Sequence, residues 1–560
     1  MKSIFRLLNE LVLLFLIIAS IFISSCSHQV EKNKSNEDLQ IENSEPAIED
    51  SFEITQQPAL CVVSFNQEAL LTCKAESTRG DVFYQWYECD DISGKNPKLI
   101  DDAVSESFET PVFVQKEIKF YYCLVKDGVE ERQSSVVAAG YTGLPIVELT
   151  TDSISFSSIT RDTYVPVDLR IIMPDGTEIT KTLSKKGIKG RGNSSWVMPK
   201  KGYNLNFDDK EAFFNLGESK KWCIIANYSD KTLLRNKYAS VLANDFFNSE
   251  WNPSFVFVDV VMNGEYSGNY IFCEKNTIDK QRVDIQDISD CTEKKINNGK
   301  YVDKNDDGVI NLNDGGFLLE IDARYDADYY FTSEKHVSFT LKDPDEITEE
   351  MLEHITNIVQ EAEDVLYSDD FSDNLEEDIN QSKWMKYFDI DSFVDWYFVN
   401  EIGKNRDSCF FSSVYMFYNP NDSKLHMGPI WDFDPAFGND GENGTLMYLQ
   451  TSSDWYIKNA RWISRMFEDP RFVEKIKTRW TEKKYALEQT FADDGIIQNL
   501  AEEIKVSADL NFIKWPILGV YVWPNASGYE DRLTFQDEID YMKFWLSERF
   551  TWLDSAIDEL

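Results

Sequence analysis

Two carboxylates, Asp432 and Asp434, stand one residue apart in the segment Trp431-Asp432-Phe433-Asp434-Pro435. Carboxylate oxygens are ligands that Mg²⁺ accepts while it keeps several of its waters. A third carboxylate, Asp407, lies upstream. An acid that orients a hydroxyl group, followed by acids that hold a metal ion, is the arrangement that phosphoryl transfer requires. The alternative interpretation is that Asp432 and Asp434 only form a polar turn, and these residues alone do not decide between the two.

A glycine-rich stretch occupies residues 186–196, between segments that alternate like β-strands. Within it, Gly190, Gly192 and Ser194 stand close to several lysines and to Arg191. Glycines, small hydroxyls and cations are what a hairpin that cradles phosphate groups would use. The alternative is a glycine-rich turn with solvated lysines, and glycine spacing alone does not exclude it.

The charge balance limits the class of partner. The chain of 560 residues carries 98 acidic and 56 basic side chains, which gives a net charge of −42. Nucleic acid is excluded as an expected partner because its phosphates would be repelled, whereas a basic protein substrate is compatible with such a field. The acidity also suits an extracytoplasmic protein that must stay soluble. Only four histidines are present, so a His-rich zinc site is not expected.

The N-terminus has the pattern of an export signal. Lys2 and Arg6 precede an apolar run over residues 11–23, which small residues and Cys26 follow. This end resembles a bacterial lipobox, so residues 1–25 are expected to be a signal peptide and Cys26 to carry lipid. The alternative, an uncleaved membrane helix, would be short for a bilayer. Residues 26–50 are polar and acidic, which predicts a disordered tether. The predicted location is the bacterial cell envelope, outside the cytoplasm and anchored to the membrane through lipid.

Residues 51–142 contain short alternating runs between turn signals, which predict a small all-β sandwich. Cys73, Trp86 and Cys123 resemble the cysteine, tryptophan and cysteine framework of immunoglobulin domains. An extracytoplasmic location permits the Cys73–Cys123 disulfide that this resemblance implies. Cys61 and Cys89 are a candidate second pair, but connectivity is not readable from sequence. A spacer or adhesion module is the expected role.

Residues 145–560 form the main domain, with strand-like patterns first and helical patterns second. Residues 164–172 alternate and end at Pro174-Asp175-Gly176. Helical apolar spacing occurs over 233–242, 349–367, 384–399, 461–489 and 535–560. A β-rich half followed by an α-rich half predicts an α+β fold with two lobes. Asp407 and Asp432 then fall on loops after the first helices of the second lobe.

A calcium loop is predicted as an insertion over residues 303–314. Oxygen ligands recur at the spacing of a twelve-residue calcium loop, and Gly308 permits the sharp turn. The ligands are Asp303, Asn305, Asp307, the carbonyl of Val309, Asn311 and Asp314. The alternative is an acidic surface loop with chance spacing. The expected role of Ca²⁺ is structural.

Five ordered segments resemble the CotH family, the spore-coat protein H-like atypical kinases. The segments are 189–201, 227–236, 268–275, 315–322 and 431–438. They occur in family order across about 150–440, whereas the last hundred residues carry no matching motif. The resemblance implies a distantly protein-kinase-like fold and an activity that transfers phosphate from ATP to Ser or Thr of a protein, with Mg²⁺ as cofactor.

The same resemblance assigns roles to individual residues. Asp407 would accept or orient the substrate hydroxyl, and Asp432 and Asp434 would hold Mg²⁺. The implied nucleotide-binding residues are Gly190, Arg191, Gly192, Asn193, Ser194, Lys201, Arg235, Asn236 and Glu274, with Arg191 and Lys201 neutralising phosphates and Glu274 pairing a lysine. Residues 410–413 and 415–418 depart from the family pattern, so no asparagine is assigned as a metal ligand.

The predicted location raises an alternative function. ATP is scarce outside the cytoplasm, so a surface adhesin or binding lipoprotein that uses a non-catalytic kinase-like scaffold is the rival to the kinase. The presence of Asp407, Asp432 and Asp434 together favours the enzyme.

Calcium is expected to raise the melting temperature of the protein. Saturating Ca²⁺ at 100 times its Kd adds about 2.7 kcal/mol to the free energy of unfolding. The effect should vanish in the double variant Asp303→Ala/Asp307→Ala. Thermal unfolding with and without Ca²⁺ checks this, and a melting temperature independent of Ca²⁺ would mean that the loop is only acidic surface.

Overall fold

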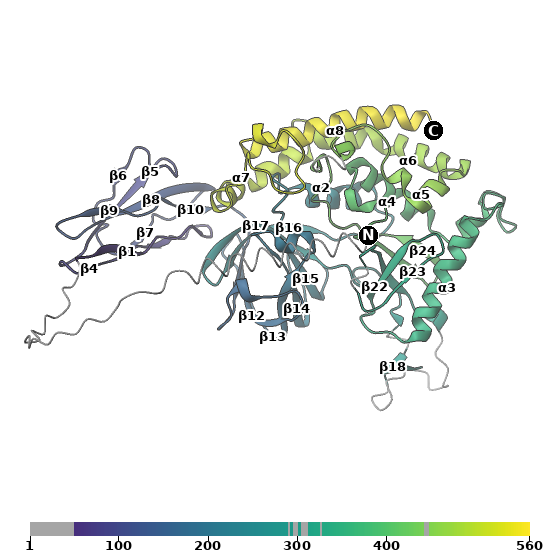
Figure 1. The fold of residues 1–560 in the computed structure, drawn as a ribbon, viewed down its shortest axis with the longest axis horizontal. Helices are drawn as coiled ribbons and strands as arrows, with labels where there is room; N and C mark the ends of the chain where they lie inside the picture. The colour runs from purple at the N-terminus through teal and green to yellow at the C-terminus, as the bar shows by residue number, and fades with distance from the viewer. Residues whose placement is uncertain (1–49, 289–291, 295–300, 304–311, 325–326, 442–446) are drawn as a thin grey trace, which may run out of the picture. The chain divides into compact units, whose positions relative to one another are not determined.

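Strands dominate the first half of the described chain and helices the second, as the sequence predicts for an α+β protein (Figure 1). The structure, a computed structural model, describes residues 50–288, 292–294, 301–303, 312–324, 327–441 and 447–560. One compact unit spans Phe52–Leu560. Among the described residues, no helix has both the length and the apolar character needed to cross a membrane.

The first ten strands form a β-sandwich. A sheet in the order β2-β10-β8-β5-β6, with β9 paired to β8, faces the pairs β1-β4 and β3-β7 across a shared apolar core. The strands are β1 (Phe52–Gln56), β2 (Cys61–Val62), β3 (Leu70–Thr72), β4 (Lys74–Ser77), β5 (Phe83–Cys89), β6 (Lys98–Leu99), β7 (Ser107–Glu109), β8 (Glu117–Lys126), β9 (Glu131–Gln133) and β10 (Val137–Tyr141).

Cys73, Trp86 and Cys123 meet in the core of this sandwich, and all three are fully buried. Trp86 stacks on Phe108 with a centroid separation of 5.7 Å. The thiols of Cys73 and Cys123 are hydrogen-bonded to one another, and the structure holds both as free cysteines. The disulfide between them stays a prediction. Tyr121 lies two residues before Cys123, where immunoglobulin domains place a tyrosine whose hydroxyl bonds to the backbone. Here that hydroxyl has no hydrogen-bond partner among the described residues, so the expected tyrosine corner is not formed.

A closed barrel of seven strands follows, in the order β11-β12-β13-β14-β15-β17-β16. Its interior is filled by alternate apolar residues of every strand, among them Leu169, Leu205 and Phe272. The strands are β11 (Ile146–Thr150), β12 (Val165–Ile172), β13 (Glu178–Arg191), β14 (Gly202–Glu211), β15 (Ser219–Ile225), β16 (Phe255–Met262) and β17 (Glu265–Glu274).

The glycine-rich stretch is the connection between β13 and β14, which pair from Gly187 opposite Asn206 to Arg191 opposite Gly202. Two of its glycines are sterically required. A Cβ atom at Gly190 would lie 2.2 Å from the ring of Trp196. Gly192 has a φ of +94°, and its Cβ would lie 2.0 Å from the hydroxyl oxygen of Ser195. The predicted hairpin is therefore confirmed, and its tip folds back over its own strand.

A second sheet has the order β21-β22-β20-β23-β24. These strands are β20 (Phe317–Ile321), β21 (Tyr330–Thr332), β22 (Ser338–Asp343), β23 (Val414–Asn419) and β24 (Lys424–Met427), and a separate hairpin joins β18 (Thr292–Lys294) to β19 (Tyr301–Asp303). Because β20 pairs with β23, residues near 320 lie beside residues near 415. The predicted calcium ligands Asn305, Asp307, Val309 and Asn311 lie outside the described residues.

The helices gather mostly on one side of the barrel and of the second sheet (Figure 1). They are α2 (Arg235–Val241), α3 (Glu349–Leu366), α4 (Ile390–Gly403), α5 (Arg461–Met466), α6 (Pro470–Glu488), α7 (Ile496–Lys514) and α8 (Phe535–Asp558). Two predicted helices were wrong in their bounds. The helix expected over 384–399 begins only at Ile390, where Asp389 caps it, and the one expected over 461–489 is divided by Pro470, which starts α6.

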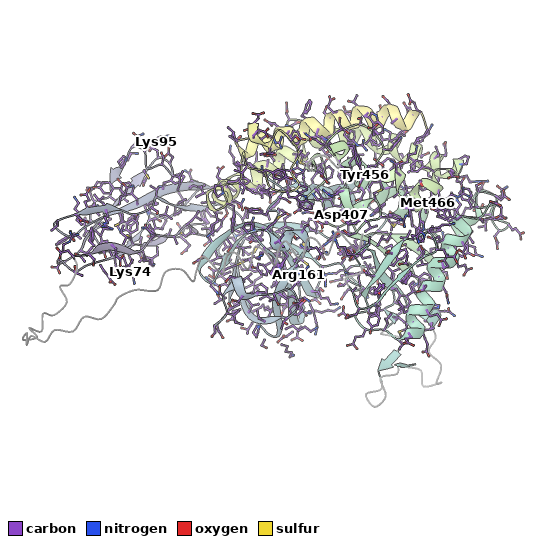
Figure 2. The ribbon with its side chains drawn as sticks, viewed as in Figure 1. Lys74, Lys95, Arg161, Asp407, Tyr456 and Met466 are labelled. Carbon is purple, nitrogen blue, oxygen red and sulfur yellow. The ribbon has the colours of Figure 1, made fainter. Side chains whose placement is uncertain are left out.

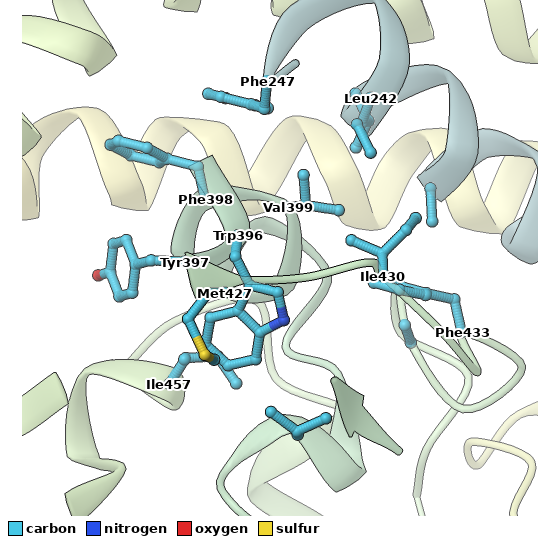
Figure 3. Close-up of a cluster of buried hydrophobic side chains, with 14 of the residues drawn as sticks. Leu242, Phe247, Trp396, Tyr397, Phe398, Val399, Met427, Ile430, Phe433 and Ile457 are labelled. Atoms are coloured by element: carbon cyan, nitrogen blue, oxygen red, sulfur yellow. The ribbon is translucent and has the colours of Figure 1, made fainter. Parts of the chain in front are cut away.

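Helix α4 is the centre of the large apolar core. Thirteen of its fourteen residues are buried, so it lacks a polar face and has almost no amphipathic asymmetry. Trp396 and Val399 pack with Met427 and Ile430, while Phe398 stacks on Phe247 (Figure 3). The loop that carries Asp432 and Asp434 is thereby anchored, because Ile430 and Phe433 belong to this core.

One buried ion pair joins α4 to α8. Arg549 and Glu401 have exposed side-chain fractions of 0% and 1%, and their nearest charged atoms are 2.6 Å apart. Arg549 also donates to the carbonyls of Ser452 and Asp454 at 2.9 Å. Loss of one partner would leave the other charge buried and unpaired.

Arg549→Ala is expected to lower the free energy of unfolding by about 3–5 kcal/mol. The matched control is Lys543→Ala on the same helix, which removes a pair to a fully exposed Asp493 and should cost less than about 1 kcal/mol. Denaturant unfolding of both variants measures the difference. Equal losses would show that the buried pair does not hold α8 on α4.

Candidate functional site

A cavity of about 640 Å³ lies where the β13–β14 loop of the barrel faces the second sheet. Its walls come from the loop residues 189–195, the ends of β17 and β20, and the loops around residues 407 and 432. Asp407 lies between the barrel, which carries Arg161, and the helices (Figure 2). Of the residues predicted to bind nucleotide or metal, the cavity is lined by Gly190, Arg191, Gly192, Asn193, Ser194, Asp407, Asp432 and Asp434.

Asp432 occupies a left-handed backbone conformation with a φ of +63°. Such a conformation is uncommon for residues other than glycine, although aspartate tolerates it better than most. The amide of Asn405 donates to the Asp432 carbonyl at 3.2 Å, and the hydroxyl of Ser413 lies 3.4 Å from Oδ2. The bent backbone at Asp432 allows Asp432 and Asp434 to line the same cavity although only Phe433 separates them.

Asn236 holds the segment that carries Asp432 and Asp434 in position. Its side-chain amide donates to the carboxylate of Asp434, and its carbonyl oxygen accepts the backbone N–H of Phe433 at 2.8 Å. Arg235, which is ion-paired with Asp230 at 2.5 Å, donates to the carbonyl of Ala436 at 3.0 Å. Both residues were predicted to touch nucleotide or metal. This is corrected, because neither lines the cavity; they position the segment that does.

Asp407 stands in a short 3₁₀ helix, η7 (Arg406–Ser408). The hydroxyl of Ser412 donates to its Oδ2 at 3.1 Å. The guanidinium of Arg324 lies 3.9 Å from the same carboxylate oxygen. The other oxygen, Oδ1, accepts no hydrogen bond from the described residues and is the atom that a substrate hydroxyl would approach. Ser412 and Ser413, in the run that departs from the family pattern, therefore contact Asp407 and Asp432 respectively.

Crowding of carboxylates shifts the titration of the site. Burial, Asp432 and Asp230 raise the pKa of Asp434 to about 8. Burial and Asp432 raise the pKa of Asp407 to about 6. The pKa of Asp432 is also raised by burial, against the opposing effect of Arg191 and Arg324. Raised carboxyl pKa values mean that these charges repel one another and would favour a bound cation.

Several cations face these acids from the cavity wall. Arg191 lies over the ring of Trp431 at 5.1 Å, between the glycine-rich hairpin and the acidic loop. Sequence reasoning missed the other cations of the lining, which are Arg161, Lys189, Lys275, Arg324, Lys342 and Arg406. Of these, Lys275 is half-buried, and desolvation lowers its pKa to about 8. Lys275 is the last residue of segment 268–275, which carries the family resemblance. Its place in that segment was the one signal in the sequence that could have identified it as a site residue.

Two predicted residues have other partners. Lys201 donates to the carbonyl of Trp196 and lies 4.6 Å from that ring, so it braces the hairpin and does not line the cavity. Glu274 accepts the backbone N–H of Ser254 at 3.1 Å and lies 3.9 Å from Arg282. The prediction that Glu274 pairs a lysine is therefore wrong.

Glu320 and Lys342 form the carboxylate–lysine pair that does line the cavity. Their charged atoms are 2.7 Å apart on the adjacent strands β20 and β22. Glu320 also accepts the backbone N–H of Ser413 at 3.0 Å, which links the pair to the residue beside Asp432.

The donor set fits Mg²⁺ with a nucleotide triphosphate. Asp432 and Asp434 supply oxygen ligands to a hard cation, and their pKa values are raised by burial and by neighbouring carboxylates although Arg191 acts against the shift. Arg191, Lys275 and the exposed loop at Asn193 and Ser194 are suited to phosphate oxygens. Among the described residues, a second group that can hold a metal ion is Glu250, Asp389 and His426, away from this cavity.

The family model described as CotH kinase protein matches residues 188–553. Because this range is more than half of the 560 residues, the chain belongs to the CotH kinase family. The sequence-based assignment is thereby confirmed. Membership implies an atypical kinase that uses ATP and a divalent metal ion on a protein substrate.

A comparison with curated proteins gave no match. Among solved structures, the chain is similar to a complex of titin with an obscurin-like 1 immunoglobulin domain, at 14% identity and a TM-score of 0.13, over 16% of this chain and 94% of that chain. It is similar to titin tandem immunoglobulin domains at 11% identity and a TM-score of 0.13, over 28% of this chain and 91% of that chain. At these scores the likenesses carry no argument, and the immunoglobulin-like character of residues 51–142 stays a prediction.

The pKa of Asp434 makes stability depend on pH. Its folded-state pKa of about 8 lies above the ordinary value of 3.8, so the folded protein binds more protons and loses stability as pH rises from about 4 to 8. In EDTA at pH 8, Asp434→Asn should therefore be more stable than wild type by about 1 kcal/mol or more.

The same substitution should remove the stabilisation by Mg²⁺. Thermal unfolding at pH 5 and pH 8, with and without Mg²⁺, measures both effects, and Asp493→Asn is the control because Asp493 is fully exposed. If the stability of Asp434→Asn depends on pH as steeply as that of wild type, the Asp434 carboxylate is not the group that makes stability depend on pH.

Proposed function

We propose that this protein transfers the terminal phosphoryl group of ATP to a Ser or Thr of a protein substrate. The observation that carries the proposal is the convergence of Asp407, Asp432 and Asp434 with Arg191 and Lys275 in one cavity beneath a glycine-rich hairpin. These groups come from segments more than 240 residues apart in sequence (434 − 191 = 243). Phosphoryl transfer relies on positioning and charge neutralisation, which is what such a set provides.

Asp407 acts on the acceptor hydroxyl. Its Oδ2 is held by Ser412, which fixes the carboxylate plane and leaves Oδ1 for the substrate. With a pKa of about 6, the carboxylate is charged at neutral pH and can accept a proton. Arg324 lies close to the same carboxylate and lowers the pKa of Asp407, which opposes the increase caused by Asp432.

Asp432 and Asp434 would hold the metal ion, which would supply positive charge to neutralise phosphate oxygens. Asn236 keeps Asp434 oriented, and Ser413 does the same for Asp432. Arg191 and Lys275 line the same cavity and would bind phosphate oxygens, Arg191 through its planar guanidinium and Lys275 as a point charge, and the loop at Gly192 and Asn193 would add backbone N–H donors. Trp431, stacked on the Arg191 guanidinium, limits the position of that cation.

The proposed setting is the cell envelope of a bacterium, with the chain anchored through lipid at Cys26 and the sandwich of residues 51–142 as a spacer. The charged and apolar pattern of residues 1–25 supports it. A surface adhesin built on a non-catalytic scaffold remains the rival function, and the labelling experiment decides between the two.

The full chain with Mg²⁺ and γ-labelled ATP should label itself or a Ser/Thr-rich protein. Asp432→Ala should reduce labelling to background because a metal ligand is lost, and Asp407→Asn should reduce it by at least about 100-fold. The matched control is Asp369→Ala, an exposed acid outside the cavity, which should label like wild type.

Phosphoamino-acid analysis then identifies Ser or Thr as the acceptor. Equal labelling in wild type and Asp432→Ala would contradict the proposal. Absence of labelling in all forms, together with nucleotide binding that Mg²⁺ does not affect, would favour the scaffold function.

A further inference from the structure

A second cavity adjoins the site. It holds about 540 Å³ and lies between the tip of the glycine-rich hairpin and the segment that follows α7. We call it the apolar groove; it is lined by Ser194, Val197, Met198, Pro199, Tyr228, Ile517, Val520, Tyr521, Val522 and Trp523. Among the described residues, none with a formal charge lines it. The apolar groove also exposes large side chains to solvent, with exposed fractions of 83% for Val197, 51% for Val520 and 37% for Trp523.

The apolar groove is continuous with the proposed catalytic cavity. Ser194, Met198 and Trp523 line both. The ring of Trp523 lies 5.1 Å from the guanidinium of Arg406, the residue immediately before Asp407. A polypeptide that presents a hydroxyl to Asp407 therefore passes Trp523 when it leaves on this side.

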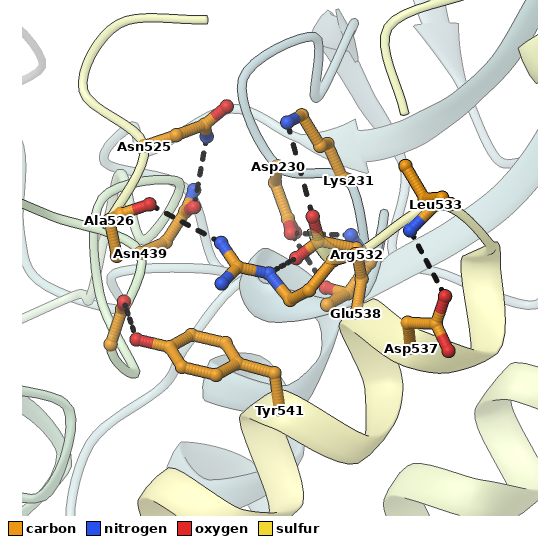
Figure 4. A network of polar contacts seen from close by, with 12 residues as sticks. Asp230, Lys231, Asn439, Asn525, Ala526, Arg532, Leu533, Asp537, Glu538 and Tyr541 are labelled. Carbon is orange, nitrogen blue, oxygen red and sulfur yellow. Dashed lines mark hydrogen bonds and ion pairs between the residues drawn. The ribbon is translucent and has the colours of Figure 1, made fainter. Parts of the chain in front are cut away.

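Polar contacts hold the segment that carries residues 517–523 of the groove, and Figure 4 shows part of this network around Lys231, Asn525 and Arg532. Lys231 donates to the carbonyl of Val520 at 2.7 Å. Asn525 donates to the carbonyl of Ser229 at 2.6 Å and to the side-chain oxygen of Asn439 at 3.0 Å. Arg532, paired with Glu538 at 3.0 Å, lies within hydrogen-bond distance of the Ala526 carbonyl. A surface that is fixed before binding loses less entropy when a ligand docks.

We infer that the apolar groove binds an apolar side chain of the protein substrate, close in sequence to the Ser or Thr that is phosphorylated. This inference rests on the proposed kinase function. Exposed apolar surface that continues into a catalytic cavity marks a binding site, and a groove lined by Val, Met, Ile and aromatic side chains offers apolar area but, within the described part of the chain, no carboxylate to pair with a basic residue. Because Trp523 at the edge of the groove contacts Arg406, the neighbour of Asp407, and an extended chain advances about 3.3 Å per residue, the anchoring residue lies within a few positions of the acceptor.

The test uses two fluorescent Ser peptides that differ only in one residue, Leu or Gln, with that residue moved through positions one to four on either side of the acceptor. At one or two of these positions, the Leu peptide should bind the full chain about 10-fold to 100-fold more tightly, since burial of a Leu side chain contributes about 1.5–3 kcal/mol. Fluorescence anisotropy measures this binding without requiring catalysis.

Val520→Asp should abolish the preference for Leu and leave the KM for ATP unchanged. The matched control is Phe544→Asp, which places a charge at an equally exposed apolar position on α8. The inference is overturned if Leu and Gln peptides bind alike at every position, if both variants behave alike, or if Val520→Asp instead converts a dimer to a monomer in light scattering, which would make the groove a contact between copies. If the Leu peptides bind more tightly but no peptide is phosphorylated, the proposed kinase activity is contradicted, whereas the binding of an apolar side chain in the apolar groove is supported.

Discussion

The burial of several carboxylates in one cavity is the constraint on which this structure depends. Asp407, Asp432 and Asp434 share one cavity, and Asp230 stands behind them. Burial first, and then repulsion from neighbouring carboxylates, raises their pKa values, which expresses the free-energy cost of keeping these charges in one cavity. A cation bound among them would lower that cost.

The surrounding fold holds these carboxylates with hydrogen-bond donors and does not fully neutralise their negative charge. Asn236 and Ser412 bind carboxylate oxygens, and Arg235 holds the backbone just beyond Asp434. The apolar core around α4 anchors the same loop through Phe433. Cations line the same cavity: Arg191 lies over Trp431 beside Asp432, and Arg324 lies 3.9 Å from Asp407, so positive charge is interleaved with the acids.

Much of the architecture could be predicted because its signals are local. Alternation predicted the strands, and apolar spacing predicted α2, α3 and α8. The errors have physical reasons. Helix α4 is buried on nearly all sides, so it lacks the periodic contrast that marks a boundary, and the predicted helix began too early. Helix α7 carries little amphipathic asymmetry as well and was not predicted.

The sequence by itself determined the identities of the chemical groups: the acids at 407, 432 and 434, the glycines at 190 and 192, and the membership in the CotH kinase family that the comparison confirms. Only the tertiary structure decided which other groups join them. Lys275 and Arg324 enter the cavity because two sheets face each other there, while Lys201 and Glu274 turn to other partners. Such contacts depend on distances between segments far apart in the chain, and local patterns do not encode those distances.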